Sequence, residues 1–113
     1  MSRGQYPSTR MRRSRMTAFS RRLVAESRLD TADLIWPLFV IEGQNMAEPI
    51  DTMPGVFRYS IDQLLQQAAE AIELTIPAIA IFPSIDAALK DESGSLARDG
   101  DNLVCRAVSA VKA

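Results

Sequence analysis

The chain has 113 residues, 47% of them hydrophobic, with one cysteine, no histidine and a formal net charge of −1. This composition is typical of a globular protein and excludes disorder throughout the chain. It also excludes an intramolecular disulfide and a zinc site built from cysteine and histidine, and no apolar run forms a secretory signal or reaches the ~20 residues of a membrane span. We therefore expect a protein of the reducing cytoplasm that binds no membrane.

The charge is divided unevenly between the start of the chain and the rest. Residues 1–28 contain eight arginines and one glutamate, a net charge of +7, whereas residues 29–113 contain five basic and thirteen acidic groups, a net charge of −8. Such a basic arm can bind nucleic acid, a membrane surface or an acidic partner, and it is also typical of an organelle transit peptide. Nucleic acid is the weaker alternative because the arm has few aromatic residues. The opposite charges favour an arm that packs on another copy of the same body.

The first predicted element is a short helix that follows an extended segment. Residues 1–16 show no apolar periodicity and are expected to be extended. A narrow apolar stripe then predicts a helix over residues 17–26, formed by Phe19, Leu23 and Val24. Thr17 or Ser20 can cap this helix. A turn over residues 30–33 leads into the next element.

A strand, a loop and a longer helix come next. Residues 34–41 are apolar on both faces, which is typical of a strand covered on both sides, but Pro37 cannot donate a ladder hydrogen bond and requires an edge or early position. Two glycines and two prolines indicate a connecting loop over residues 42–59. A helix is predicted over residues 60–74, with Ser60 and the glutamine three residues later forming a capping box. Its expected apolar face contains Ile61, Leu64, Leu65, Ala68, Ala71 and Ile72.

The pattern ends with a second strand, a long polar stretch and a helix. The strand is predicted over residues 78–82, the polar stretch over residues 84–102, and the helix from Leu103 onward. A strand, a helix and a strand in this order form the unit of parallel α/β sheets and barrels. Two parallel strands cannot bury a core by themselves, because such a sheet needs helices on both faces. We therefore expect the chain to be the opening part of a larger α/β enzyme.

The residues alone contain no catalytic constellation. Only Lys90 and Lys112 could serve as amine nucleophiles, but Lys90 lies in the polar stretch beside two acids, whose charges raise a lysine pKa instead of lowering it. The acids Asp86, Asp91 and Glu92 could hold a divalent cation through oxygen ligands, yet they lack a fixed ligand spacing, so a solvated loop is favoured. Cys105 is expected to be a small packed side chain.

Several segments together resemble the delta-aminolevulinic acid dehydratases, or porphobilinogen synthases. They are RMRRSRMTAFSRRLVAESRLDTADLIWPLFVIEG, EPIDTMPGVFRYSIDQLL and IPAIAIFPSIDAALKDESGS, in this order, and the likeness runs from about residue 10 to residue 112. The resemblance implies a (β/α)8 TIM barrel with an extended N-terminal arm, of which this chain holds the N-terminal third, truncated after about two strands. The expected parts are a basic arm with a short helix over residues 1–28 and the incomplete barrel over residues 29–113.

The resemblance also implies a reaction and an assembly. The family joins two molecules of 5-aminolevulinate into porphobilinogen, a hydro-lyase step of tetrapyrrole and heme biosynthesis, using two Schiff-base lysines that lie beyond residue 113. Zinc or magnesium serves the full-length family, and no residue of this chain is expected to bind the metal. The arm residues Arg10, Arg12, Arg13 and Arg15 are expected to join subunits into a homo-octamer, which makes the arm part of the mature protein. Phe82, at the end of the second strand, is expected to form a wall of the substrate site.

The chain departs from the family pattern at three places. Thr75 stands where glycine is common before IPA, Ala87 stands where proline is frequent, and ARDGDN replaces a stretch that usually contains YN. A threonine where the backbone requires φ > 0 costs about 1 kcal/mol or more. Such drift leaves an alternative open, in which the chain is a genuine short product that is not catalytic and acts only as an interaction fragment.

Overall fold

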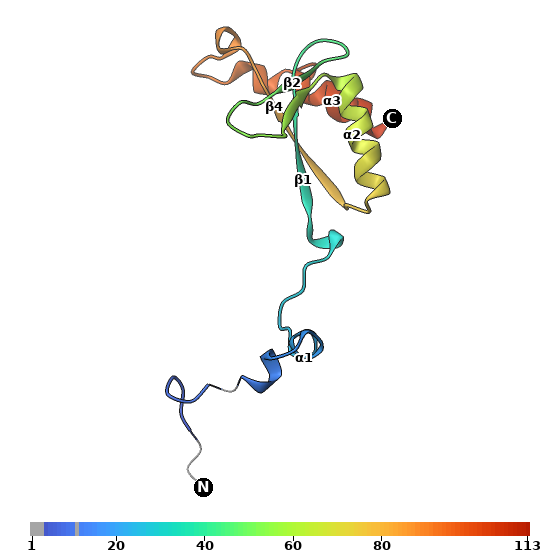
Figure 1. The fold of residues 1–113 in the computed structure, drawn as a ribbon. Helices are drawn as coiled ribbons and strands as arrows, with labels where there is room; N and C mark the ends of the chain where they lie inside the picture. Colours follow the sequence, from blue (N-terminus) through green and yellow to red (C-terminus); the bar gives the residue numbers. More distant parts are fainter. Residues whose placement is uncertain (1–3, 11) are drawn as a thin grey trace.

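The computed structural model of the chain describes residues 4–10 and 12–113, so residues 1–3 and 11 of the predicted arm lie outside the described residues. The molecule measures 73 × 36 × 27 Å, and its radius of gyration is 22.7 Å. A compact protein of about 100 residues has a radius of gyration of about 13 Å. The difference arises because the N-terminal arm extends away from a small α/β body (Figure 1).

One mixed sheet of four strands forms the centre of the body, in the order β2-β3-β1-β4. β1 (Ile35–Val40) and β4 (Ala78–Pro83) are parallel and pair along their whole length, from Ile35 opposite Ala78 to Val40 opposite Pro83. The predicted parallel arrangement of these two strands is therefore confirmed. β1 is one residue shorter than predicted at each end, and β4 extends one residue further than predicted at its carboxyl end.

The segment predicted as a plain loop contains two further strands. β2 (Ala47–Pro49) and β3 (Phe57–Tyr59) form an antiparallel hairpin, and β3 also pairs in parallel with Phe39 and Val40 of β1. The prediction of about two strands was therefore wrong for this sheet. Each of these strands has only three residues, which is too short for an alternating apolar pattern to indicate a strand.

Pro37 lies where β1 has a neighbour on one side only. β4 pairs with β1 before and after Pro37, whose own partner is Ala80. β3 pairs with β1 only at Phe39 and Val40. The proline therefore occupies a stretch of β1 that is an edge among the described residues. This place meets the predicted requirement for an edge or early position in the strand.

Two helices cover one face of the sheet, α2 (Ile61–Glu73) and α3 (Leu103–Lys112) (Figure 1). Side chains alternate across a strand, so residues two apart on β1 point to the same face. The buried cluster lies between that face and the two helices and consists of Leu38, Val40, Leu64, Leu103 and Ala107. The helix predicted over residues 60–74 is confirmed, but its predicted apolar face is only partly buried. Leu65 and Ile72 remain 40% and 77% exposed.

The start of α2 is fixed by a loop and not by the predicted capping box. Ser60 is fully buried, and its hydroxyl oxygen accepts from the Met46 amide (2.9 Å) and donates to the Met46 carbonyl (3.3 Å). Gln63 Nε2 donates to Asn45 Oδ1 at 2.8 Å. Neither side chain bonds to the free amides of the helix, so the predicted capping box is wrong. Both residues instead attach the loop before β2 to the first turn of α2.

Thr75 ends α2 in the left-handed region, with φ = 58°. The Ile76 amide donates to the Ala71 carbonyl and the Thr75 amide donates to the Ile72 carbonyl, at 2.9 and 3.0 Å. These two bonds form a Schellman motif, whose left-handed residue is usually glycine. The sequence-based prediction that Thr75 occupies a position with φ > 0 is confirmed.

The arm contains one turn of 3-10 helix, η1 (Arg13–Arg15), and a short helix, α1 (Ala18–Leu23). Thr17 is the N-cap of α1, and its amide donates to the Ser20 hydroxyl at 3.3 Å. The helix ends at Leu23, three residues before its predicted end. A second 3-10 turn, η2 (Thr31–Asp33), occupies the predicted turn before β1.

The polar stretch after β4 contains two 3-10 turns, η3 (Ala87–Leu89) and η4 (Ser95–Arg98). Asn102 then caps α3, because its side-chain oxygen accepts from the Cys105 amide at 2.9 Å. An ion pair between Glu42 and Arg106 joins the segment after β1 to α3. The predicted last helix is confirmed.

Candidate functional site

Phe82 lies near the carboxyl end of β4, on the sheet face that α2 and α3 leave uncovered. Its partner across the strand pair is Phe39 of β1, and the two rings stack at a tilt, with centroids 5.8 Å apart and planes 34° apart. Leu38 and Val40 point to the opposite, buried face, since side chains alternate along a strand. Phe82 is 49% exposed. The two rings therefore form an apolar wall and offer no acid, base or nucleophile.

Asp91 organises the loop that leaves β4. Its carboxylate accepts from the Ser95 hydroxyl, from the Ser95 amide at 2.9 Å and from the Ser93 hydroxyl at 3.1 Å. These hydrogen bonds, that of the Ser95 hydroxyl above all, lower the pKa of Asp91 from 3.8 to about 2. The charge is stabilised by its own loop, as expected for a carboxylate with several donors.

The acids of this loop do not converge on a common point. Asp86 Oδ1 accepts from the Ala88 amide at 2.9 Å, so this carboxylate caps η3 while Asp91 binds the serines. Within residues 4–10 and 12–113, no three histidine, cysteine, aspartate or glutamate side chains lie close enough to share a metal ion. The donor set of the described residues does not fit the zinc or magnesium that the family resemblance implies, so no step involving a metal is assigned to this chain.

Both lysines have exposed side chains. Lys90 follows η3 in the polar stretch, and Lys112 lies at the end of α3. A lysine that forms a Schiff base requires burial or a neighbouring cation to lower its pKa. Neither residue has such surroundings among the described residues, so neither is assigned this chemistry.

Cys105 is half-buried near the start of α3. It borders a mostly apolar cavity of about 330 Å³ between α3 and the end of β4. Its neighbours around this cavity include Pro83, Ile85, Leu96 and Leu103. The thiol packs among apolar side chains, in agreement with the expected packing role.

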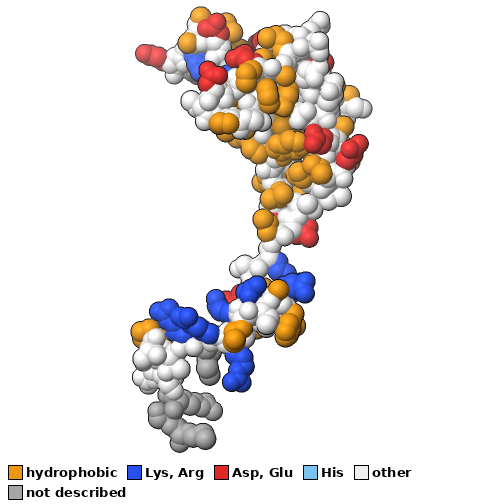
Figure 2. Space-filling model, viewed as in Figure 1, with side chains coloured by type: hydrophobic (Ala, Val, Ile, Leu, Met, Phe, Trp, Pro, Cys, Tyr) orange, Lys and Arg blue, Asp and Glu red, His pale blue; other side chains and the backbone are white. Residues whose placement is uncertain are grey.

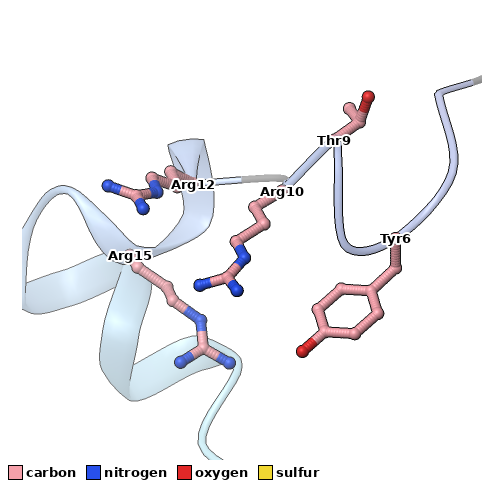
Figure 3. A pocket seen from close by; sticks show the side chains of 5 residues that line it. All are labelled: Tyr6, Thr9, Arg10, Arg12 and Arg15. Atoms are coloured by element: carbon pink, nitrogen blue, oxygen red, sulfur yellow. The ribbon is translucent and has the colours of Figure 1, made fainter.

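The arm brings three arginines together with a tyrosine. Arg10, Arg12 and Arg15 border a cavity of about 550 Å³ together with Tyr6 and Thr9 (Figure 3). The Arg10 guanidinium carbon lies 5.6 Å from the centroid of the Tyr6 ring, which is within the range of a cation–π contact. Arg13 lies in the adjacent turn η1 and is exposed.

No acidic residue neutralises these arginines in the described part of the chain. The ion pairs there join Arg58 to Glu48 (3.0 Å) and Arg106 to Glu42, all of them in the body. Figure 2 shows the basic side chains gathered along the arm, while the acidic side chains lie mainly on the body. The arrangement fits a surface that binds an acidic partner.

The sequence matches the family model described as delta-aminolevulinic acid dehydratase over residues 8–113. The chain belongs to this family. Among curated dehydratases, it is 53% identical to that of Bradyrhizobium diazoefficiens over 103 residues, which are 91% of this chain and 29% of the relative. It is 41% identical to that of Chlamydia pneumoniae over 105 residues, 93% of this chain and 32% of the relative.

A solved dehydratase has a similar fold. The delta-aminolevulinic acid dehydratase of Toxoplasma gondii ME49, crystallised with the reaction product porphobilinogen, matches with a TM-score of 0.84 and 36% identity. The match covers 92% of this chain and 29% of the Toxoplasma chain. The chain thus spans less than a third of the length of these dehydratases.

Sequence reasoning missed two features of the candidate site. Phe39 was not singled out, although its place two residues before the end of an apolar strand puts it opposite Phe82 when the strands are parallel. The hairpin β2–β3 was also missed. The signal that could have indicated it is the turn of Met53, Pro54 and Gly55, in which Gly55 has φ = 84°.

No described helix is both long and apolar enough to cross a membrane.

Proposed function

We propose that this chain supplies the arm and the first strands of a porphobilinogen synthase, a hydro-lyase that condenses two molecules of 5-aminolevulinate. The observation that carries the proposal is the family match over residues 8–113, together with the similarity to a dehydratase that holds porphobilinogen. β1, α2 and β4 follow in this order along the chain, and the two strands are parallel. A (β/α)8 barrel is built from such strand–helix–strand units. The proposal keeps the division into an arm of residues 1–28 and a barrel segment of residues 29–113.

In this proposal, the chain contributes the wall of the substrate site and no catalytic group. Barrel enzymes build their active sites at the carboxyl ends of the strands, and Phe82 lies at that end of β4. Its stacking with Phe39 supports a fixed apolar wall. The Schiff-base lysines and any zinc or magnesium site belong to the rest of the protein, in the reducing cytoplasm that a single half-buried thiol suits.

The arm is proposed to join subunits into a homo-octamer. Arg10, Arg12, Arg13 and Arg15 have no acidic partner among the described residues, and the body carries the opposite charge. Charge complementarity of this kind orients partners and accelerates their encounter. Neither nucleic acid nor a membrane is needed to account for it.

An activity assay tests this function. The full-length protein, meaning the gene product that contains this chain and the rest of a dehydratase sequence, should form porphobilinogen from 5-aminolevulinate, and Phe82→Ala should raise KM several-fold. Leu89→Ala, which removes an exposed side chain from η3, serves as the control. A full-length protein that forms no porphobilinogen would refute the proposed activity, and an unchanged KM would refute the role of Phe82.

The alternative is a short product that acts only as an interaction fragment. The DNA beyond the codon for Ala113 distinguishes the two, because an in-frame continuation supports the enzyme and a stop codon supports the fragment. The family match over residues 8–113 and the 53% identity to a curated dehydratase favour the enzyme.

A further inference from the structure

The sheet face opposite α2 and α3 carries an aromatic pair at the carboxyl end of β1 and β4. Three cross-strand pairs share this face, because side chains alternate along each strand and Leu38 and Val40 point into the buried cluster. From the amino end to the carboxyl end, the three pairs are Ile35 with Ala78, Pro37 with Ala80, and Phe39 with Phe82. The aromatic pair therefore lies at the end of the strands where barrel enzymes build their active sites.

Phe39 is the better supported member of this pair. Its strand is paired on both sides at this level, because Phe39 lies opposite Phe82 of β4 and opposite Arg58 of β3. Arg58 is itself held by an ion pair with Glu48 of β2 at 3.0 Å. The backbone that carries the Phe39 ring is thus fixed by both neighbouring strands.

The Phe39 ring limits where the Phe82 ring can turn. The ring centroids are 5.8 Å apart, and contacting aromatic pairs have centroids roughly 4.5–7 Å apart. One step toward the amino end, the same face carries only the methyl group of Ala80 and the compact ring of Pro37. A Phe82 side chain without the Phe39 ring beside it could therefore change rotamer toward β1 and the middle of the strands.

We propose that Phe39 is a positioning residue for the substrate site. Its ring holds the Phe82 ring at the carboxyl end of β4, where Phe82 contacts the apolar carbons of the substrate, and Phe39 acts only through Phe82. The inference rests on the proposed function, because it takes Phe82 as a wall for 5-aminolevulinate. It adds a residue whose contact with Phe82 lies wholly within this chain.

The expected signature is a change in KM. 5-Aminolevulinate contains adjacent methylene groups between its ketone and its carboxylate, and burying such groups against an apolar wall favours binding. A wall that contacts the substrate equally in the ground state and the transition state contributes uniform binding, whose loss raises KM and leaves kcat unchanged. A Phe82 ring that has turned away no longer covers these carbons.

A double-mutant cycle in the full-length protein tests the positioning role. Phe39→Leu keeps apolar volume but removes the ring, and it should raise KM for 5-aminolevulinate several-fold with kcat unchanged. In a Phe82→Ala background, Phe39→Leu should change KM by no more than about twofold, because the positioned ring is already absent. A crystal structure of the Phe39→Leu protein should show the Phe82 ring turned toward β1.

Phe57→Leu is the matched control. Phe57 belongs to a second tilted aromatic pair, with Tyr59, whose centroids are 6.1 Å apart. Tyr59 packs against the buried cluster, so Phe57, two residues before it on β3, lies on the side of the helices. The control removes the same ring from the same sheet on the other face and should leave KM unchanged.

The outcomes separate the positioning role from the proposed function. A full-length protein that forms no porphobilinogen refutes the activity, and this inference with it, while an unchanged KM in Phe82→Ala refutes the wall. If Phe82→Ala raises KM but Phe39→Leu does not, the wall stands and the positioning role is wrong. Equal KM effects of Phe39→Leu in both backgrounds, or a Phe82 ring that stays in place, would also overturn it. A lower unfolding midpoint with an unchanged KM would reduce Phe39 to a packing residue.

Discussion

Thr75 pays a conformational cost at the end of α2 that glycine would avoid. With φ = 58° it holds a left-handed conformation, and the Schellman bonds of Thr75 and Ile76 require it to do so. The left-handed conformation was predicted correctly, because the resembled family commonly has glycine at this helix-ending position. The sequence did not predict the partners of Ser60, since Met46 lies 14 residues away and only the tertiary fold brings it to the helix.

Replacing Thr75 with glycine should stabilise the full-length protein by about 1 kcal/mol, because glycine adopts φ > 0 without steric cost. The substitution also removes the hydrogen bond between the Thr75 and Thr31 hydroxyls, which is 3.1 Å long. Thr31→Ala removes that bond, together with the bond of the Thr31 hydroxyl to Asp30 Oδ1 at 3.3 Å, leaves the backbone of Thr75 strained, and is the matched control. Urea unfolding measures both variants. A Thr75→Gly protein less stable than Thr31→Ala would contradict the strain argument.

Asp91 gives a prediction about pH. Its pKa is about 2 in the folded loop, below the ordinary 3.8, so the bonds to Ser93 and Ser95 stabilise the loop above pH 3.8 and are lost as pH falls through about 2. The carboxyl ¹³C shift of Asp91 should therefore stay nearly constant between pH 5 and about 3. Ser95→Ala should raise the pKa toward its ordinary value, whereas Ser109→Ala should not. A wild-type midpoint near 3.8 would count against this hydrogen-bonded loop.

At the scale of elements, long periodic segments were predicted well and short strands were not. α2 and α3 have enough turns for an apolar stripe to identify them, and β1 and β4 are continuous apolar runs. The three-residue strands of the hairpin have no such pattern and exist because β3 finds a partner in β1. The sequence of α2 predicted one continuous apolar face, but not that Leu65 and Ile72 on this face remain exposed in the body.

Leu64 should be the most sensitive position of α2. It is fully buried in the cluster with Leu38, Val40, Leu103 and Ala107, so Leu64→Ala leaves a cavity and should destabilise the full-length protein by about 2–5 kcal/mol. Leu89→Ala, at a leucine that is 60% exposed, should cost well under 1 kcal/mol by the usual magnitude for surface positions. Thermal unfolding compares the two. Equal losses would show that the core is not where this structure has it.

At the scale of the whole molecule, an exposed basic arm and an acidic body favour assembly. The strand–helix–strand pattern predicted the parallel strands and the family resemblance implied the extended arm, whereas composition alone left nucleic acid and membranes open. What the sequence could not predict is how far the described part of the arm extends from the body, because that distance depends on tertiary contacts and not on local sequence pattern (Figure 1).

Reversing the charge of the arm should weaken the oligomer. Changing Arg12, Arg13 and Arg15 together to glutamate in the full-length protein should shift sedimentation toward smaller species, because the arm would then repel an acidic body. The wild-type assembly should also weaken as salt rises, as screening predicts. Arg98→Glu, in η4, is the control. Unchanged sedimentation, or sub-micromolar DNA binding at physiological salt, would contradict an arm built for assembly.

The central claim is that this chain is a non-catalytic part of a porphobilinogen synthase, and borohydride trapping tests it most directly. The full-length protein and the 113-residue chain are each incubated with 5-aminolevulinate, reduced, digested and examined by mass spectrometry. A reduced Schiff base fixes the substrate carbon to the lysine that attacked it. We expect adducts in the full-length protein only at lysines outside residues 1–113, and none in the chain alone. An adduct on Lys90 or Lys112, or a full-length protein without any adduct, would contradict the account.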